Sequence, residues 1–262
     1  MSDDTFMLSI VIPAYNEARR LPTTLATIRA YLEAQPYAAE VLVVDDGSSD
    51  ATAKVAAAYP GVTVLQRDHR GKGFAVRAGA LAAQGSFVLL CDADLAVPIE
   101  EWSRFESYLR TGDDVVIGSR EGVGATREGE PWYRHVMGRV FNHIIALVAL
   151  RGINDTQCGF KAMSREVAQD LFRRVRIYGD DAPVVHGAAV TAYDVELLFL
   201  ARKAGYRIRE VPVPWQYGTE TKVNPVRDSL RNLRDVLQVR WNDLRGRYRS
   251  TASVPPHMTL EK

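Results

Sequence analysis

Three polar or acidic motifs follow short apolar runs in the first part of the sequence. They are PAYNE at 13–17, DDGSSD at 45–50 and DAD at 92–94. Two carboxylates two residues apart just after a buried strand can turn toward one cation, and Mg²⁺ and Mn²⁺ favour carboxylate oxygens together with substrate phosphates. Such a cation neutralises the charge on a departing diphosphate. An isolated Asp-x-Asp more often solvates a turn or caps a helix, but the other two motifs favour a metal site at Asp92 and Asp94.

The DDGSSD motif allows two interpretations. Gly47 suits a tight turn, and Ser49 or Asp50 could cap the helix that follows. Capping does not account for the two successive carboxylates, Asp45 and Asp46, at the end of a strand. A carboxylate there can accept hydrogen bonds from a nucleobase N–H or from ribose hydroxyls, which indicates a nucleotide pocket.

A fourth motif, RGKG at 70–73, precedes a helix. Its two glycines allow a close approach of the backbone, and Lys72 together with the helix N-terminus favours a phosphate group. The spacing GxxxxGK[ST] is absent, so this motif is not a P-loop.

Alternating strands and helices position these motifs in the first half of the chain. Strands are predicted at 7–12, 41–44, 62–65, 87–90 and 115–117, and helices at 18–34, 51–59, 73–83 and 98–110. This alternation is typical of βαβ units with a mainly parallel sheet, so the predicted fold class is α/β. Ligands bind outside the carboxyl ends of the strands in such sheets, where the motifs lie.

The pattern changes after Arg120. Residues 121–130 are rich in glycine and charge and predict a mobile loop, and 154–161 predicts a polar turn. Further helices are predicted at 132–150, 167–175, 194–204 and 225–245, with a strand at 207–213 and an irregular stretch at 179–192.

Composition excludes several classes of protein. The chain has 262 residues, 47% hydrophobic and 25% charged, enough for one large domain or one domain with a small appendage. A net charge of +1 argues against a nucleic-acid-binding protein. The two cysteines cannot form a disulfide framework or, alone, a four-ligand zinc site. Without a signal-peptide pattern or an apolar run of about 18 residues, we expect a cytoplasmic protein, soluble or peripheral to a membrane.

The last predicted helix is amphipathic and basic. Residues 224–250 hold seven arginines and three aspartates. One apolar stripe recurs at spacings of four and three residues: Val226, Leu230, Leu233, Leu237, Trp241 and Leu244. Either residues 225–245 lie on an anionic bilayer, or the stripe packs onto the rest of the protein. The sequence leaves both alternatives open.

The ordered set of motifs resembles glycosyltransferase family 2. The resemblance rests on IVIPAYNEARRL, VVDDGSSDAT, RGKGFAVRAGALAAQG, DADLAVP, VIGSR and DTQCGFK, from about residue 8 to 161. It continues through YDVELLFLARKAGYRIREVPVPW and TKVNP. Within the family the chain is similar to polyprenyl-phosphate hexosyltransferases, the dolichyl-phosphate glucosyltransferases and mannose synthases among them.

The resemblance implies the GT-A nucleotide-sugar fold, an inverting reaction and a divalent metal, Mg²⁺ or Mn²⁺. It implies that the base and ribose pocket of the donor is lined by Pro13, Tyr15 and Glu17. Asp46 is then expected to contact the base, Asp92 the ribose and the metal, and Asp94 the metal. Lys72 is a further candidate for donor binding. The mannose synthases have a metal-binding Gln where this chain has Ala96, so more water is expected in its metal shell.

On the acceptor side, Arg120 and Arg134 resemble a clamp for a lipid phosphate, which an arginine can bind bidentately. Asp155 is the candidate for a general base or for acceptor positioning, and with Asp94 it completes the predicted catalytic residues. Asp194 and Glu196 are weaker candidates, because residues i and i+2 point apart on a helix. The GDDAPVVHGAAVT stretch departs from the family pattern, and His186 within it is expected to be a loop histidine.

The predicted function is transfer of a hexose, glucose from UDP-glucose, to a polyprenyl or dolichyl phosphate at the inner face of a membrane. A lipid phosphate is anionic near neutral pH and needs positioning, whereas a hydroxyl acceptor needs a base. Four alternatives remain: a soluble glycosyltransferase with a sugar or small hydroxylated acceptor, a GDP-mannose-dependent mannosyltransferase, a nucleotidyltransferase and a non-catalytic nucleotide-sugar-binding protein. Against the third, the sequence lacks a Gly-rich first-strand loop.

We expect a catalytic domain over 1–222, with its donor half at about 1–120 and its acceptor half at about 121–222. A basic amphipathic helix over 223–250 and a flexible tail over 251–262 are expected to follow.

Overall fold

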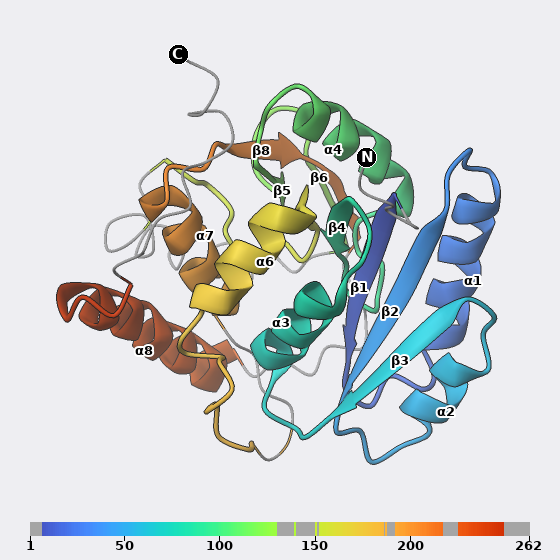
Figure 1. Cartoon of the computed structure of the whole chain (residues 1–262), viewed down its shortest axis with the longest axis horizontal. Coiled ribbons are helices and arrows are strands. Elements are labelled where there is room, and N and C mark those ends of the chain that lie inside the picture. Colours follow the sequence, from blue (N-terminus) through green and yellow to red (C-terminus); the bar gives the residue numbers. More distant parts are fainter. Residues whose placement is uncertain are drawn as a thin grey trace.

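A seven-stranded sheet forms the centre of the protein (Figure 1). The computed structural model describes residues 7–129, 139, 150, 152–185, 187, 192–216 and 225–248. The strand order is β3-β2-β1-β4-β7-β5-β8. The strands are β1 (Leu8–Ala14), β2 (Ala39–Asp46), β3 (Val62–Arg67), β4 (Phe87–Leu90), β5 (Val115–Ser119), β7 (Lys161–Ser164) and β8 (Ile208–Pro212).

The sheet is mainly parallel. Strand β1 pairs in parallel with β2 and β4, β2 with β3, and β5 with β8. Strand β7 lies between β4 and β5 and runs antiparallel to both. The α/β class and the mainly parallel sheet predicted from the sequence are therefore confirmed. Strand β7 was not predicted, because its four residues, KAMS, are too few to show a period and adjoin the polar segment 154–161.

Helices cover both faces of the sheet. On one face lie α3 (Lys72–Ala82), α6 (Arg165–Arg174) and α7 (Tyr193–Lys203); on the other lie α1 (Leu21–Glu33), α2 (Thr52–Ala57) and α4 (Trp102–Arg110). Alternate residues of β1 enter the two separate cores: Val11 belongs to the first, and Ile10 and Ile12 to the second. Because the strand is covered on both faces, its apolar run is continuous.

Two connections differ from the sequence-based expectation. The predicted helix at 98–110 begins as the 3-10 turn η1 (Ile99–Glu101) and continues as α4. The predicted loop at 121–130 contains β6 (Thr126–Glu128), which pairs in parallel with β9 (Pro214–Gln216). The predicted helix at 132–150, including Arg134, lies outside the described residues except for positions 139 and 150, and so does His186.

The last helix, α8 (Pro225–Leu244), contacts α7. The predicted stripe does not pack onto the protein over its last two turns, where Leu237, Trp241 and Leu244 are exposed. The buried side chains of α8 lie on another face of the helix. In the part of the chain that the structure describes, no helix is both long enough and apolar enough to cross a membrane. The predicted domain division near residue 222 stays a prediction.

Candidate active site

The three motifs meet at the carboxyl ends of neighbouring strands β2, β1 and β4, as their parallel pairing requires. The loops after β1 and β2 are joined by hydrogen bonds. The amide of Asn16 donates to the Ser48 hydroxyl at 2.9 Å, and Asn16 Oδ1 accepts from the Ser49 amide at 2.8 Å. The Glu17 amide donates to Thr52 at 2.8 Å. Asn16 holds a positive φ of 54°, which its short polar side chain tolerates.

Lys72 and Asp92 form an ion pair at the centre of the site, with 2.6 Å between Nζ and Oδ1. Lys72 opens α3 and Asp92 follows β4, so the pair joins two connections of the sheet. Burial opposes the charge on Lys72, but the carboxylates of Asp92 and Asp194 outweigh it and raise the pKa of Lys72. Burial likewise disfavours charge on Asp92, and Lys72, Lys161 and Arg120 together lower its pKa.

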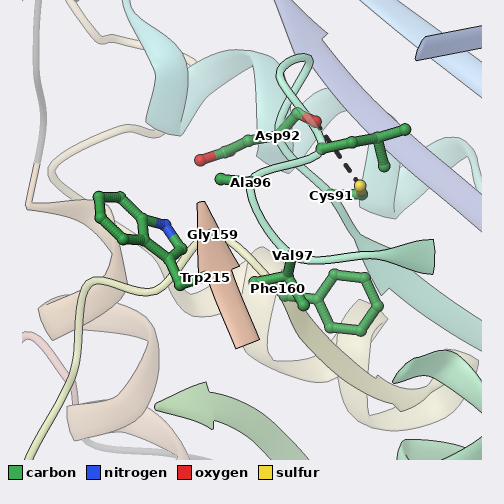
Figure 2. Close-up of a pocket in the computed structure, with 8 residues that line it drawn as sticks. Cys91, Asp92, Ala96, Val97, Gly159, Phe160 and Trp215 are labelled. Carbon is green, nitrogen blue, oxygen red and sulfur yellow. Dashed lines mark hydrogen bonds between the residues drawn. The ribbon is translucent and has the colours of Figure 1, made fainter. Parts of the chain in front are cut away.

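Asp92 lies against a glycine that leaves room for its carboxylate. A Cβ on Gly159 would stand 2.1 Å from Asp92 Oδ2, so no other residue fits there without moving Asp92. Asp92, Ala96, Gly159 and Trp215 line a small pocket beside β4 (Figure 2). Figure 2 shows Asp92 and Trp215 on opposite sides of Ala96.

Asp94 follows Asp92 by two residues in the same loop and lines a wider hollow with α1 residues and Gln216. Its Oδ1 accepts a hydrogen bond from the Ala96 amide at 3.1 Å. Partial removal from water and repulsion from the Asp92 carboxylate raise the pKa of Asp94. The mutual repulsion means that the site favours a positive ligand between or beside the two carboxylates.

Asp92 and Asp94 are the candidate ligands for a divalent metal. Among the described residues, no cluster of three or more His, Cys, Asp or Glu side chains could hold a metal ion. Two carboxylates suffice for Mg²⁺ or Mn²⁺ when substrate phosphate oxygens and water complete the shell. Asp92 and Asp94 fit that requirement, although Lys72 already bonds one oxygen of Asp92.

Arg120 and Asp155 form a second ion pair, which the sequence did not predict. Asp155 is fully buried, and its oxygens accept from Nε and Nη2 of Arg120 at 2.7 and 2.9 Å. The Arg120 amide also donates to Oδ2, at 3.0 Å. Burial alone would raise the pKa of Asp155, but Arg120 holds it well below its usual range. Such a carboxylate is a weak proton acceptor and a strong anchor for an arginine.

Two residues around this pair were missed by sequence reasoning. Glu210 Oε1 accepts from the Asp155 amide at 2.8 Å and from the Ser119 hydroxyl at 2.7 Å, so it fixes the turn that carries Asp155. The ring of Trp215 lies 5.4 Å from the Arg120 guanidinium carbon. Both lie in the stretch YDVELLFLARKAGYRIREVPVPW, which carries the family resemblance, but the sequence reasoning gave neither of them a role.

Asp46 is buried, and its carboxylate binds the loop before α3. It accepts from the Arg70 and Gly71 amides, both at 2.9 Å, and pairs with Nδ1 of His69 at 2.8 Å. Burial raises the pKa of Asp46 despite these bonds. The His69 ring stacks on Tyr15 with 3.8 Å between centroids. Base contact by Asp46 stays a prediction, and the structure gives this carboxylate a role in holding the loop.

The described part of the unusual segment at 179–192 lies against that same loop. The Val185 amide donates to the His69 carbonyl at 2.8 Å, and Arg70 Nη1 donates to the carbonyl of Asp180 at 2.7 Å. Arg77 of α3 binds both carboxylate oxygens of Asp180, at 2.6 and 3.1 Å. The segment thus supports the loop that holds Asp46.

Of the weaker candidates, only Asp194 lies in the site. It pairs with the fully buried Lys161, which also donates to the Cys158 carbonyl. Glu196, two residues later on α7, points elsewhere, as the helical spacing predicts, and accepts from Tyr248 at 2.6 Å. Pro13, Tyr15 and Glu17 lie at the end of β1 and just after it, and their contacts with a donor stay predictions.

A family model described as Glycosyl transferase family 2 matches residues 9–172. A dolichyl-phosphate beta-glucosyltransferase of Dictyostelium discoideum is 31% identical, over 93% of this chain and 76% of the relative. One of Drosophila melanogaster is 35% identical, over 92% and 77%. The crystal structure of glucosyl-3-phosphoglycerate synthase from Mycobacterium tuberculosis with Mn²⁺, UDP-glucose and phosphoglyceric acid is 19% identical, with a TM-score of 0.59 over 89% of this chain and 79% of that one. That likeness confirms the GT-A type of fold.

Proposed function

The chain belongs to glycosyl transferase family 2, and on that premise we propose that it transfers a hexose to a polyprenyl phosphate. The donor is a nucleotide-diphospho-sugar, and the reaction inverts the anomeric carbon. Glucose is the sugar in the name of both relatives, and UDP-glucose is the donor bound in the structurally similar synthase. We assign the activity to the cytoplasmic face of a membrane, where a lipid phosphate is accessible.

The observation that carries the proposal is the Arg120–Asp155 pair beside Asp92 and Asp94, the carboxylates proposed to bind the donor. Arg120 is close enough to Asp92 to lower its pKa, so a cation oriented by Asp155 lies next to the place proposed for the donor diphosphate. Arginine binds phosphate oxygens through a planar fork, which suits an acceptor phosphate. Arg134, the second residue of the proposed clamp, lies outside the described residues.

Asp92, Asp94 and Lys72 are proposed to stabilise the diphosphate leaving group. Asp94 and Asp92 would hold Mg²⁺ or Mn²⁺, which supplies charge neutralisation for the departing diphosphate. Lys72 is charged at neutral pH because its pKa is raised. It would leave its ion pair with Asp92 and bind the same phosphates when the donor is present. One acceptor oxygen bonds to the anomeric carbon while the bond from that carbon to the diphosphate breaks, and the nucleoside diphosphate leaves with the electron pair.

No general base is needed for this acceptor. A phosphate is already anionic near neutral pH, and the lowered pKa of Asp155 makes this carboxylate unsuitable for removing a proton. We therefore propose that Asp155 positions Arg120.

Radiolabelled UDP-glucose, Mg²⁺ and a short polyprenyl phosphate test the proposal. We expect label in the organic extract, its loss with EDTA and its recovery with Mn²⁺. The absence of extractable label with every common UDP- and GDP-linked hexose would exclude a lipid acceptor. A thermal-shift panel of UDP, GDP and their sugars with Mn²⁺ identifies the donor, because a bound ligand stabilises the folded state.

The second candidate is a soluble glycosyltransferase with a hydroxylated acceptor. In its favour, the structurally similar synthase binds a small soluble molecule, phosphoglyceric acid, together with UDP-glucose. A hydroxyl acceptor requires a base, so this candidate predicts that Asp155→Asn abolishes kcat. A phosphate acceptor predicts a raised acceptor KM instead.

A further inference from the structure

Helix α8 buries a face of polar side chains and two valines, and it presents its large apolar side chains to solvent. Among its described side chains, those from residue 231 onward, the buried ones are Asn232, Asp235, Val236, Val239 and Asn242. Leu237, Trp241 and Leu244 are 54%, 53% and 74% exposed, and they are three of the five exposed large apolar side chains in the described part of the chain. A surface helix in water alone turns its large apolar side chains inward as well.

Hydrogen bonds fix this orientation of the helix. The hydroxyl of Tyr178 donates to Asp235, which also accepts from the Ala192 amide at 3.3 Å. Asn242 donates to the hydroxyl of Tyr248 at 3.2 Å, and that hydroxyl donates to Glu196 of α7 at 2.6 Å. Rotating α8 to bury its apolar side chains would leave these buried polar groups without partners, at a cost for each. The exposed apolar side chains are therefore specified by the packing of the inner face.

Leu237, Trp241 and Leu244 stand at positions i, i+4 and i+7, so they share one face of the helix. Arg234 and Arg245 are exposed beside them, and the guanidinium carbon of Arg245 lies 4.4 Å from the Trp241 ring centroid. We call these five residues the α8 outer face. Of the two aspartates in the described side chains of α8, Asp235 is buried and Asp243 pairs with Lys203. The α8 outer face is thus apolar and positively charged.

We propose that the α8 outer face docks onto an anionic lipid bilayer. An apolar face flanked by arginines lies at the boundary between headgroups and acyl chains, where each arginine adds attraction to anionic lipid. A second copy of the chain fits less well, because a twofold contact would bring like charges together and three side chains are far fewer than a stable dimer interface requires. The inference goes beyond the proposed function, since it concerns the lipid surface and not the acceptor phosphate.

Sedimentation of the full chain with vesicles tests the proposal. One set contains phosphatidylcholine alone, and the other contains phosphatidylcholine with phosphatidylglycerol. We expect the wild type to prefer the anionic set. The variant Leu237→Gln/Trp241→Gln/Leu244→Gln should bind both sets at least about tenfold more weakly. Arg234→Gln/Arg245→Gln should lose about 25-fold on anionic vesicles, at about fivefold for each arginine, and little on neutral ones.

Val184→Gln is the matched control, because Val184 is 56% exposed but lies outside α8; it should bind like the wild type. Equal binding by the triple-Gln variant, or no binding by the wild type, would overturn the proposal. So would a dimer in solution that the triple-Gln variant dissociates. Transfer to a short, water-soluble polyprenyl phosphate without vesicles reports the proposed function separately. Vesicle binding without transfer refutes only the function, and transfer without vesicle binding refutes only the docking surface.

Discussion

Replacing Asp155 by asparagine separates a carboxylate that positions Arg120 from one that accepts a proton. Asparagine keeps the size and one oxygen acceptor of the side chain but removes its charge. Asp155 accepts three hydrogen bonds from Arg120 and one from the Gln157 amide. The substitution therefore weakens a buried ion pair without opening a cavity.

The structure sets how much of the free energy of unfolding Asp155→Asn is expected to lose. Asp155 is 0% exposed and Arg120 is 19% exposed at their side chains. Removing one partner of a buried pair costs about 3–5 kcal/mol, and the access of Arg120 to water places this case near the lower value, about 3 kcal/mol. In a chain of this size that loss lowers Tm by about 6–12 °C. Asp113→Asn is the control, since its partner Arg209 is 52% exposed, and it should cost no more than about 1 kcal/mol.

Denaturation and steady-state kinetics are measured on Asp155→Asn, Arg120→Gln and the double variant. If Asp155 acts through Arg120, each single variant raises the acceptor KM by about tenfold, which corresponds to one lost phosphate contact. The double variant is then no worse than Arg120→Gln, because the two residues act as a unit. A fall in kcat beyond about a hundredfold for Asp155→Asn, with the acceptor KM unchanged and Arg120→Gln nearly as active as the wild type, would refute positioning and indicate a general base.

Three further predictions concern other parts of the protein. Gly159→Ala should abolish transfer while the fold is retained, because the new Cβ would stand 2.1 Å from Asp92 Oδ2. Circular dichroism checks the fold and an activity assay checks the transfer. The control Gly179→Ala, whose new Cβ would have its nearest neighbour at 3.3 Å, should stay active. Lys72→Gln should weaken nucleotide-sugar binding by about tenfold through loss of a charge-assisted phosphate contact; titration calorimetry measures it, and unchanged affinity would contradict the assignment. Burial raises the pKa of Glu196 above 4.5, so the folded state binds its proton more tightly and this group's contribution to stability is lost as pH rises through the raised pKa. Glu196→Gln should therefore flatten the decline of Tm from pH 4.5 to neutral, and an unchanged slope would contradict this.

Local patterns in the sequence determined the class of the fold and the edge of the sheet at which the site lies. Continuous apolar runs such as FVLL, predicted and found at Phe87–Leu90, occur because a strand covered on both faces has no solvated side. The carboxyl ends of parallel neighbours meet at one edge, so PAYNE, DDGSSD and DAD had to come together. The family followed from the order of these motifs.

Only the tertiary structure decided which charged groups pair and which face of α8 is buried. Arg120 pairs with Asp155, which is 35 residues away in the sequence, and Lys72 pairs with Asp92, from which a helix and a strand separate it. Neither spacing follows a local period, so no pattern predicts it. In α8 the hydrophobic period correctly predicted a helix, but Leu237 and Trp241 face outward. The reason is that a polar side chain can be buried when another element supplies its hydrogen-bond partner, as Tyr178 does for Asp235. Such a partner lies far away in the sequence, so the local pattern does not show it.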